Sequence, residues 1–73
     1  MAKLPDVTAK QVVSVLMKFG FYEKSMKGSH KKLVYQNKTV IVPIHKRVGK
    51  GLLKSILRQA GITDEEFIEL LKK

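Results

Sequence analysis

The sequence predicts an α+β fold in which one helix precedes a three-stranded antiparallel sheet and two helices follow it. Two capping-box patterns, Thr8 with Gln11 and Thr63 with Glu66, mark helix starts. Between them the spacing of apolar residues changes from a helical period to β-branched runs with two short, hairpin-like connections. With 73 residues, we expect one domain over residues 1–73, with its helices on one face of the sheet.

The first helix is predicted over residues 9–19. Its apolar stripe consists of Val12, Val15, Leu16 and Phe19. Gly20 suits the position after a helix where the backbone turns to positive φ, and Phe21 is expected to fold back towards Leu16.

Three strands are predicted next, over Phe21–Met26, His30–Gln36 and Thr39–Ile44. The turn Lys27-Gly28-Ser29 and the two-residue connection Asn37-Lys38 join them into an antiparallel meander. Pro43 has no backbone N–H to donate to a neighbouring strand, so the third strand is expected at an edge.

A basic loop is predicted over His45–Gly51, and a helix follows over residues 50–60. Gly61 ends this helix. The last helix is expected to turn Phe67, Leu70 and Leu71 inward. Because all helices share one core, the other face of the sheet is left open.

Side-chain alternation divides the second strand between two faces. Lys31, Leu33 and Tyr35 form one set, and His30, Lys32, Val34 and Gln36 form the other. The first set has two large apolar members, so we assign it to the core. His30 then points to the open face, unless a bulge near Gly28 shifts the register.

The charge points to a polyanionic partner. Fifteen Lys and Arg against six Asp and Glu give a formal net charge of +9, which suits nucleic acid, an anionic membrane or an acidic protein. Plain solubility is the alternative. The longest apolar stretch, Val40 to Ile44, is far shorter than the ~20 residues of a membrane span, so no span is predicted. Of the three kinds of partner we favour nucleic acid, and a membrane partner is not expected.

Several kinds of chemistry are not expected. The chain has no cysteine, so it forms no disulfide, thiolate nucleophile or Cys-based zinc site. It is too short for two lobes around a cofactor, and no cofactor is expected. His30 and His45 without nearby carboxylates make a poor metal site. The carboxylates from Asp64 to Glu69 suit the start of a helix and are assigned a structural role.

The residues around the first hairpin and the basic loop are candidate anion contacts. Glycine in the turn allows positive φ and close approach of a substrate backbone, and Ser29 offers a hydroxyl and an N–H to a phosphate. An ordinary hairpin turn and a solvated basic loop are the alternatives. The candidate substrate contacts are Lys27, Gly28, Ser29, Lys31, Lys32, Lys46 and Arg47.

Three segments carry a resemblance to a known family: Gly28-Ser29-His30, the run Thr39–His45, and the run Leu52–Ile62. Together with the opening helix ending in Phe19-Gly20-Phe21, they resemble the HicA-type (YcfA-like) mRNA interferase toxins over nearly the whole chain. The resemblance implies a small α-β-β-β-α domain similar to a double-stranded-RNA-binding domain.

The resemblance also implies an activity, a residue and partners. Such toxins cleave mRNA without a metal, and His30 matches the family's catalytic histidine. A HicB-type antitoxin protein binds the toxin and blocks it. The expected location is cytoplasmic.

The chemistry can be argued separately. RNA carries its own nucleophile, the 2′-OH, so an enzyme needs to move two protons and stabilise charge on the phosphorus. Histidine suits proton transfer near neutral pH. The second group stays open among His45, Tyr35, a lysine and water. A non-catalytic RNA- or DNA-binding module and a protein-interaction domain are the alternative functions.

Overall fold

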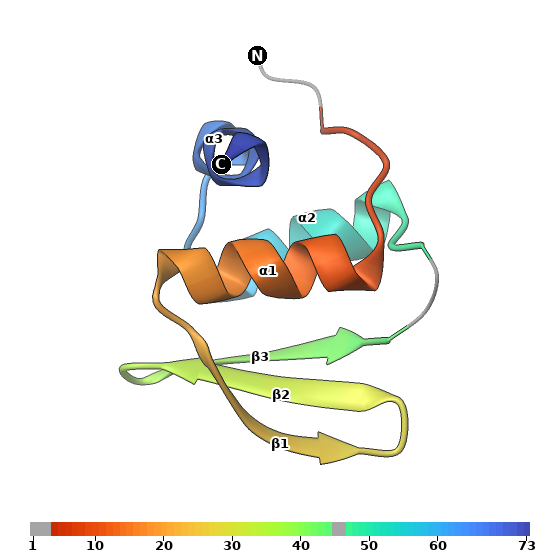
Figure 1. The fold of residues 1–73 in the computed structure, drawn as a ribbon, viewed down its shortest axis with the longest axis vertical. Helices are drawn as coiled ribbons and strands as arrows, with labels where there is room; N and C mark the ends of the chain where they lie inside the picture. Colours follow the sequence, from red (N-terminus) through yellow and green to blue (C-terminus); the bar gives the residue numbers. More distant parts are fainter. Residues whose placement is uncertain (1–3, 45–46) are drawn as a thin grey trace.

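The computed structural model describes residues 4–44 and 47–73 and has the predicted α+β layout. Figure 1 shows the sheet on one side of α1 and α2, with α3 on the far side of these helices. The elements in chain order are α1 (Ala9–Phe19), β1 (Tyr22–Lys27), β2 (His30–Tyr35), β3 (Lys38–Pro43), α2 (Lys50–Ala60) and α3 (Asp64–Lys72). All three helices therefore lie on one side of the sheet.

Helix α1 begins and ends where the sequence predicts. The Thr8 hydroxyl accepts from the backbone N–H of Gln11 (3.2 Å), and the Gln11 side chain accepts from the backbone N–H of Thr8 (2.8 Å). At the other end, Gly20 has a φ of 130° and the N–H of Phe21 donates to the Leu16 carbonyl (2.9 Å). This bond folds the chain back under the helix and into β1.

Helices α2 and α3 follow each other through a tight corner. Gly61 ends α2 in the left-handed region, with a φ of 75°, and the Thr63–Glu66 capping box opens α3. The Lys54 ammonium lies 2.8 Å from the Asp64 carboxylate and joins the two helices. None of the helices in the described part of the chain has the length and apolar content of a membrane span.

The sheet has the order β1-β2-β3, with both neighbouring pairs antiparallel. The predicted edge position of β3 is confirmed, and β1 forms the other edge. The predicted strand bounds were wrong by one residue at several ends. β1 runs from Tyr22 to Lys27 and not from Phe21 to Met26, β2 stops at Tyr35 and not at Gln36, and β3 runs from Lys38 to Pro43 and not from Thr39 to Ile44.

The turns explain these shifts. Gly28, with a φ of 59°, closes a turn of only two residues with Ser29, so Lys27 joins β1 and pairs with His30. In the second turn Gln36 has a φ of 56°, so Gln36 and Asn37 form the connection and Lys38 joins β3. Positive φ is uncommon for glutamine, which is why the sequence did not predict this turn.

A β-bulge interrupts β1. Glu23 pairs with Leu33 and Ser25 pairs with the preceding residue of β2, Lys32, so Lys24 is the extra residue. The bulge lies in the first strand and not near Gly28, and β2 pairs with β3 without interruption. The face assignment of β2 therefore follows regular alternation.

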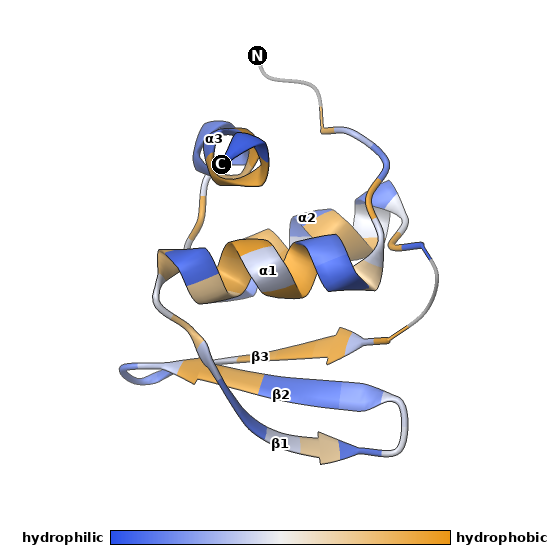
Figure 2. Ribbon diagram, in the orientation of Figure 1, coloured by the Kyte–Doolittle hydropathy of each residue, from blue (hydrophilic) through white to orange (hydrophobic). Residues whose placement is uncertain are grey.

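The core lies between the helices and part of the sheet. β3 and the second half of β2 are apolar, whereas the first half of β2 is hydrophilic (Figure 2). All six residues of β1 are exposed, because the helices pack on the β3 side of the sheet. The largest fully buried side chains are Phe67, Leu16, Leu33, Leu53, Ile56, Leu57, Val12, Val15, Val40 and Val42. The β1–β2 hairpin thus extends beyond the core.

Candidate nucleic-acid interface

One face of the sheet carries no helix, and the strand register defines its members. Residues directly opposite each other in antiparallel strands point to the same face. His30 lies between Lys27 and Pro43, and Lys32 lies between Ser25 and Ile41. The open face, as the term is used below, consists of Tyr22, Ser25, Lys27, His30, Lys32, Val34, Thr39, Ile41 and Pro43.

The predicted alternation of β2 is confirmed for all residues within the strand. Leu33 is fully buried and Tyr35 packs against the core, whereas His30 is exposed on the open face. Val34 is 9% exposed but does not belong to the core cluster. Gln36, predicted for the same face, lies in the turn after the strand.

His30 is the first residue of β2, directly after the Gly28–Ser29 turn. The turn is held from the other side, because the Ser29 carbonyl accepts from the backbone N–H of Ile44 (2.6 Å). A Cβ placed on Gly28 would meet nothing within 4 Å, so the space beside the turn is open. Among the described residues, none forms a hydrogen bond with the His30 side chain or the Ser29 hydroxyl, and both are available to a ligand.

The lysines predicted near His30 separate onto two faces. Lys27 and Lys32 lie on the open face. Lys27 is directly across from His30, and Lys32 is two residues further along β2. Lys31 lies on the helix side, where its ammonium is 3.2 Å from the Glu23 carboxylate. The structure therefore brings Lys27 and Lys32 together with His30, and it directs Lys31 away from them.

Tyr35, one possible second proton-transfer group, does not meet His30. It lies at the opposite end of β2 and on the helix side, where its ring packs edge-on against Phe19 (centroids 6.0 Å apart) and beside Phe21 (5.4 Å). Among the lysines that the structure describes, Lys27 lies directly across from His30. Of the four groups that the sequence left open, Tyr35 is removed by this geometry.

The residues predicted in the basic loop are only partly described. His45 and Lys46 lie outside the described residues. Arg47 is exposed and lines a small hollow together with Asp6, Val7 and Thr8, next to the pairing of Val7 with Val48. This hollow is formed by the segment before α1 and is separate from the open face.

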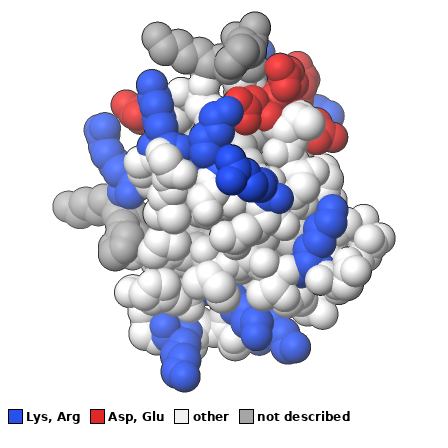
Figure 3. All heavy atoms as spheres, turned by 180° about the vertical axis from the view of Figure 1, so that it is seen from behind, with Lys and Arg blue, Asp and Glu red and all other residues white. Residues whose placement is uncertain are grey.

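The charges are unevenly distributed over the molecule. The three strands carry five lysines and one glutamate, whereas α3 carries Asp64, Glu65, Glu66 and Glu69. In Figure 3 the acidic side chains on the visible face lie towards the end away from the sheet, and the sheet end shows only basic ones. The open face therefore lies in the positive half of the molecule, which favours an anionic ligand.

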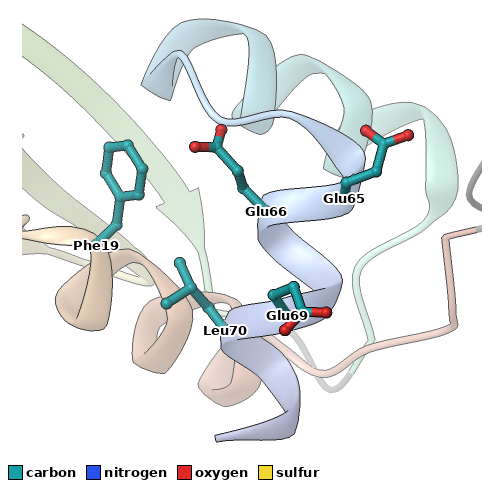
Figure 4. Close-up of a pocket in the computed structure, with 5 residues that line it drawn as sticks. All are labelled: Phe19, Glu65, Glu66, Glu69 and Leu70. Carbon is teal, nitrogen blue, oxygen red and sulfur yellow. The ribbon is translucent and has the colours of Figure 1, made fainter.

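A second hollow, of about 310 Å³, lies at the end of α1 against α3. Phe19 of α1 and Leu70 of α3 form its apolar part, and Glu65, Glu66 and Glu69 of α3 line the same side as Leu70 (Figure 4). Carboxylates repel phosphates, and the hollow lies beside Phe19 at the Tyr35 end of the sheet. It is therefore no part of an RNA site. Among the described residues, no three His, Asp or Glu side chains form a metal-binding group.

Tyr22 and Ile41 are 60% and 43% exposed on the open face, and the sequence predicts this placement for neither. Strict alternation counted back from Lys27 would place Tyr22 on the helix side, and only the bulge at Lys24 reverses this. Ile41 lies between two buried valines of similar shape, so the sequence gives no signal that it faces solvent.

Fold and site together define a small basic α+β domain that presents a histidine, lysines and a tight glycine turn on an exposed sheet face. Such a surface suits a large polyanion better than a small molecule, which needs a concave pocket. Residues 9–62 match the family described as HicA toxin of bacterial toxin-antitoxin. The chain belongs to the HicA toxin family.

Membership makes the chain a toxin of a toxin–antitoxin system, which implies an antitoxin partner, and the toxins of this family are generally ribonucleases. The match includes α1, the whole sheet and α2, and thus every residue of the open face. The comparison with curated proteins found no match.

Proposed function

We propose that this chain is an endoribonuclease, an mRNA interferase that cleaves RNA with His30 as a general acid or base. One observation carries the proposal: His30 is exposed on the open face, directly across from Lys27 and next to an unobstructed glycine turn. The match to a toxin family over these residues supports the same function.

The proposed reaction uses the 2′-OH of RNA as its nucleophile. The 2′ oxygen bonds to phosphorus while its proton passes to a base, and the bond from phosphorus to the 5′ oxygen breaks as that oxygen gains a proton. The products are a 2′,3′-cyclic phosphate and a 5′-OH. His30 carries out one of the two proton transfers, and the Lys27 ammonium stabilises the extra negative charge on the phosphorane. No step needs a metal.

The remaining contacts hold the RNA backbone. Gly28 and Ser29 let a phosphate approach the turn closely, and Lys32 extends the positive surface along β2. Lys46 and Arg47 of the basic loop are proposed as further backbone contacts, whereas Lys31, on the helix side and paired with Glu23, is not. A HicB-type antitoxin neutralises the toxin, which acts on mRNA in the cytoplasm.

The proposal is tested with wild type, His30→Ala and the control Gln59→Ala, purified identically. Gln59 is exposed on α2, on the side of the sheet away from the open face. Each protein is incubated with a long single-stranded RNA in EDTA, and the products are separated on a gel. Cleavage by wild type and Gln59→Ala, with a loss of about 10²-fold or more in His30→Ala, is expected. Equal cleavage by His30→Ala contradicts the proposal.

A non-catalytic RNA- or DNA-binding module is the second candidate. The observation in its favour concerns the second proton-transfer group that cleavage needs. Within residues 4–44 and 47–73, the open face offers no carboxylate for this role, and the ionisable side chain directly across from His30 is Lys27. This candidate predicts salt-sensitive binding without cleavage products.

A further inference from the structure

The open face holds one aromatic ring, Tyr22, which lies outside the hydrophobic core. The other aromatic side chains contribute to the core: Phe19, Phe21 and Tyr35 form a cluster with ring centroids 5.4–6.2 Å apart, and Phe67 is fully buried. Tyr22 is 60% exposed. A large ring on a solvated strand is available to stack on a flat ligand.

The bulge in β1 places this ring on the same face as His30. Phe21, the preceding residue, is buried in the core, so the next side chain points away from it. Tyr22 pairs with Val34, which shares its face with Lys32 and His30. Without the extra residue Lys24, alternation from Lys27 would direct Tyr22 to the helix side.

The spacing fits a nucleic-acid strand that runs along β2. Val34 lies four residues beyond His30, which corresponds to about 13 Å at the usual rise of a strand. At the ~3.4 Å rise of a stacked strand, this distance spans about four nucleotides, and an extended strand needs fewer. Lys32 lies between the two positions and faces the intervening phosphates.

We propose that Tyr22 stacks on an unpaired base of single-stranded RNA, about two to four nucleotides from the phosphate at His30. The inference rests on the proposed function, because it takes RNA as the ligand of the open face. Stacking needs a base that is not enclosed in a duplex, so the substrate class is single-stranded RNA. The contact is tolerant of base identity, because every base has a flat face.

The first test measures binding in the His30→Ala background, where the RNA stays intact. The variants are Tyr22→Ala, Tyr22→Phe and Met17→Ala, a control for an exposed apolar side chain on α1. A labelled single-stranded RNA is titrated by fluorescence anisotropy. Tyr22→Ala is expected to weaken binding about tenfold, with Tyr22→Phe and Met17→Ala within about twofold of the background. Unchanged affinity in Tyr22→Ala overturns the proposal.

The second test locates the base. Single abasic positions are scanned along an RNA whose cleavage site has been mapped with wild type. One position, two to four nucleotides from the cleaved bond, is expected to weaken binding to the Tyr22-containing protein but not to Tyr22→Ala. Equal losses with both proteins at every position contradict stacking on Tyr22.

The outcomes separate this inference from the proposed function. If wild type fails to cleave but Tyr22→Ala still binds RNA about tenfold more weakly, the ribonuclease fails and the stacking contact stands. If wild type cleaves and Tyr22→Ala binds RNA normally, the stacking contact fails alone. If Tyr22→Ala binds RNA normally but loses affinity for an antitoxin protein, the ring belongs to a protein interface and the inference is overturned.

Discussion

Lys27 and His30 are the last pair of the β1–β2 hairpin, joined by a turn of only Gly28 and Ser29. The short turn places the two side chains next to each other on the same face of the sheet. The Ser29 carbonyl also accepts a hydrogen bond from the backbone N–H of Ile44, so the residue after β3 holds the end of the hairpin as well. A fixed geometry of this kind lowers the cost of positioning two groups around one phosphate.

Lys27 and Lys31 form a matched pair for testing which face binds RNA. Lys27→Ala is expected to reduce both cleavage and RNA affinity, and to reduce the slope of log affinity against log salt by about 0.7, since one phosphate contact is lost. Lys31→Ala removes a lysine that lies on the helix side and pairs with Glu23. Its slope is expected to stay unchanged.

The measurement is RNA binding at four or more salt concentrations, with circular dichroism to confirm that both variants fold. The pair with Glu23 is partly exposed, so its loss should change the free energy of unfolding by no more than about 0.5 kcal/mol. A larger decrease of the slope in Lys31→Ala than in Lys27→Ala would place the RNA on the helix side.

Gly28 and Gly20 test backbone geometry in two different surroundings. Both have positive φ, but a Cβ on Gly28 meets open space, whereas a Cβ on Gly20 would lie 2.8 Å from Cε1 of Tyr35. Gly28→Ala is expected to lower the free energy of unfolding by about 1 kcal/mol from backbone strain alone. Gly20→Ala is expected to cost more, because the aromatic cluster must also move.

Urea unfolding of both variants measures these costs. Gly51→Ala is the control, because this glycine within α2 has neither positive φ nor close neighbours, so alanine is expected to cause no loss of stability there. If Gly28→Ala lowers the free energy of unfolding as much as Gly20→Ala does, the packing cost expected at Gly20 in addition to backbone strain is contradicted.

Leu33 tests the division of β2 between core and open face. It is fully buried, so Leu33→Ala is expected to lower the free energy of unfolding by about 2–5 kcal/mol, enough to threaten a domain of this size. Val34→Ala, at the next residue but outside the core cluster, should cost clearly less. Thermal unfolding of the two variants gives the comparison, and a larger loss for Val34→Ala would reverse the face assignment.

A substitution in the α3 capping box tests whether stability can be lowered without a change in RNA cleavage. Thr63→Ala removes the acceptor for the backbone N–H of Glu66, which lies 3.1 Å away, and is expected to cost about 1 kcal/mol of stability. Because α3 lies on the far side of the helices from the open face, RNA cleavage at 25 °C should be unchanged. Ser14→Ala, at an exposed residue of α1 and away from the open face, is the control for the loss of a hydroxyl side chain.

Local signals in the sequence predicted the helices well. Both capping boxes form as expected, and residues 50–60 are helical between two glycines. These signals act over three or four residues, so the sequence contains them completely. The second turn was misplaced because Gln36 adopts a conformation that glutamine rarely takes, and only the pairing of the flanking strands explains it.

The candidate site was predicted correctly only where local signals in the sequence are sufficient. His30 was placed on the open face because alternation in β2 is regular over its whole length. The cluster of lysines around His30 suggests Lys31 as a substrate contact, whereas the alternation of β2 places it on the core side, where the structure has it. Its ion pair with Glu23 and the exposure of Tyr22 both depend on the bulge at Lys24, which is a property of how two strands align and not of either strand alone.

The helices leave β1 uncovered along its full length. Substitutions at Tyr22, Ser25 or Lys27 therefore remove few buried neighbours, and the fold tolerates a wide choice of residues there. If the open face binds RNA as proposed, substitutions in β1 can alter RNA binding while α1, α2 and β3 keep the domain folded. The side chains of this strand and the stability of the fold can thus be changed separately.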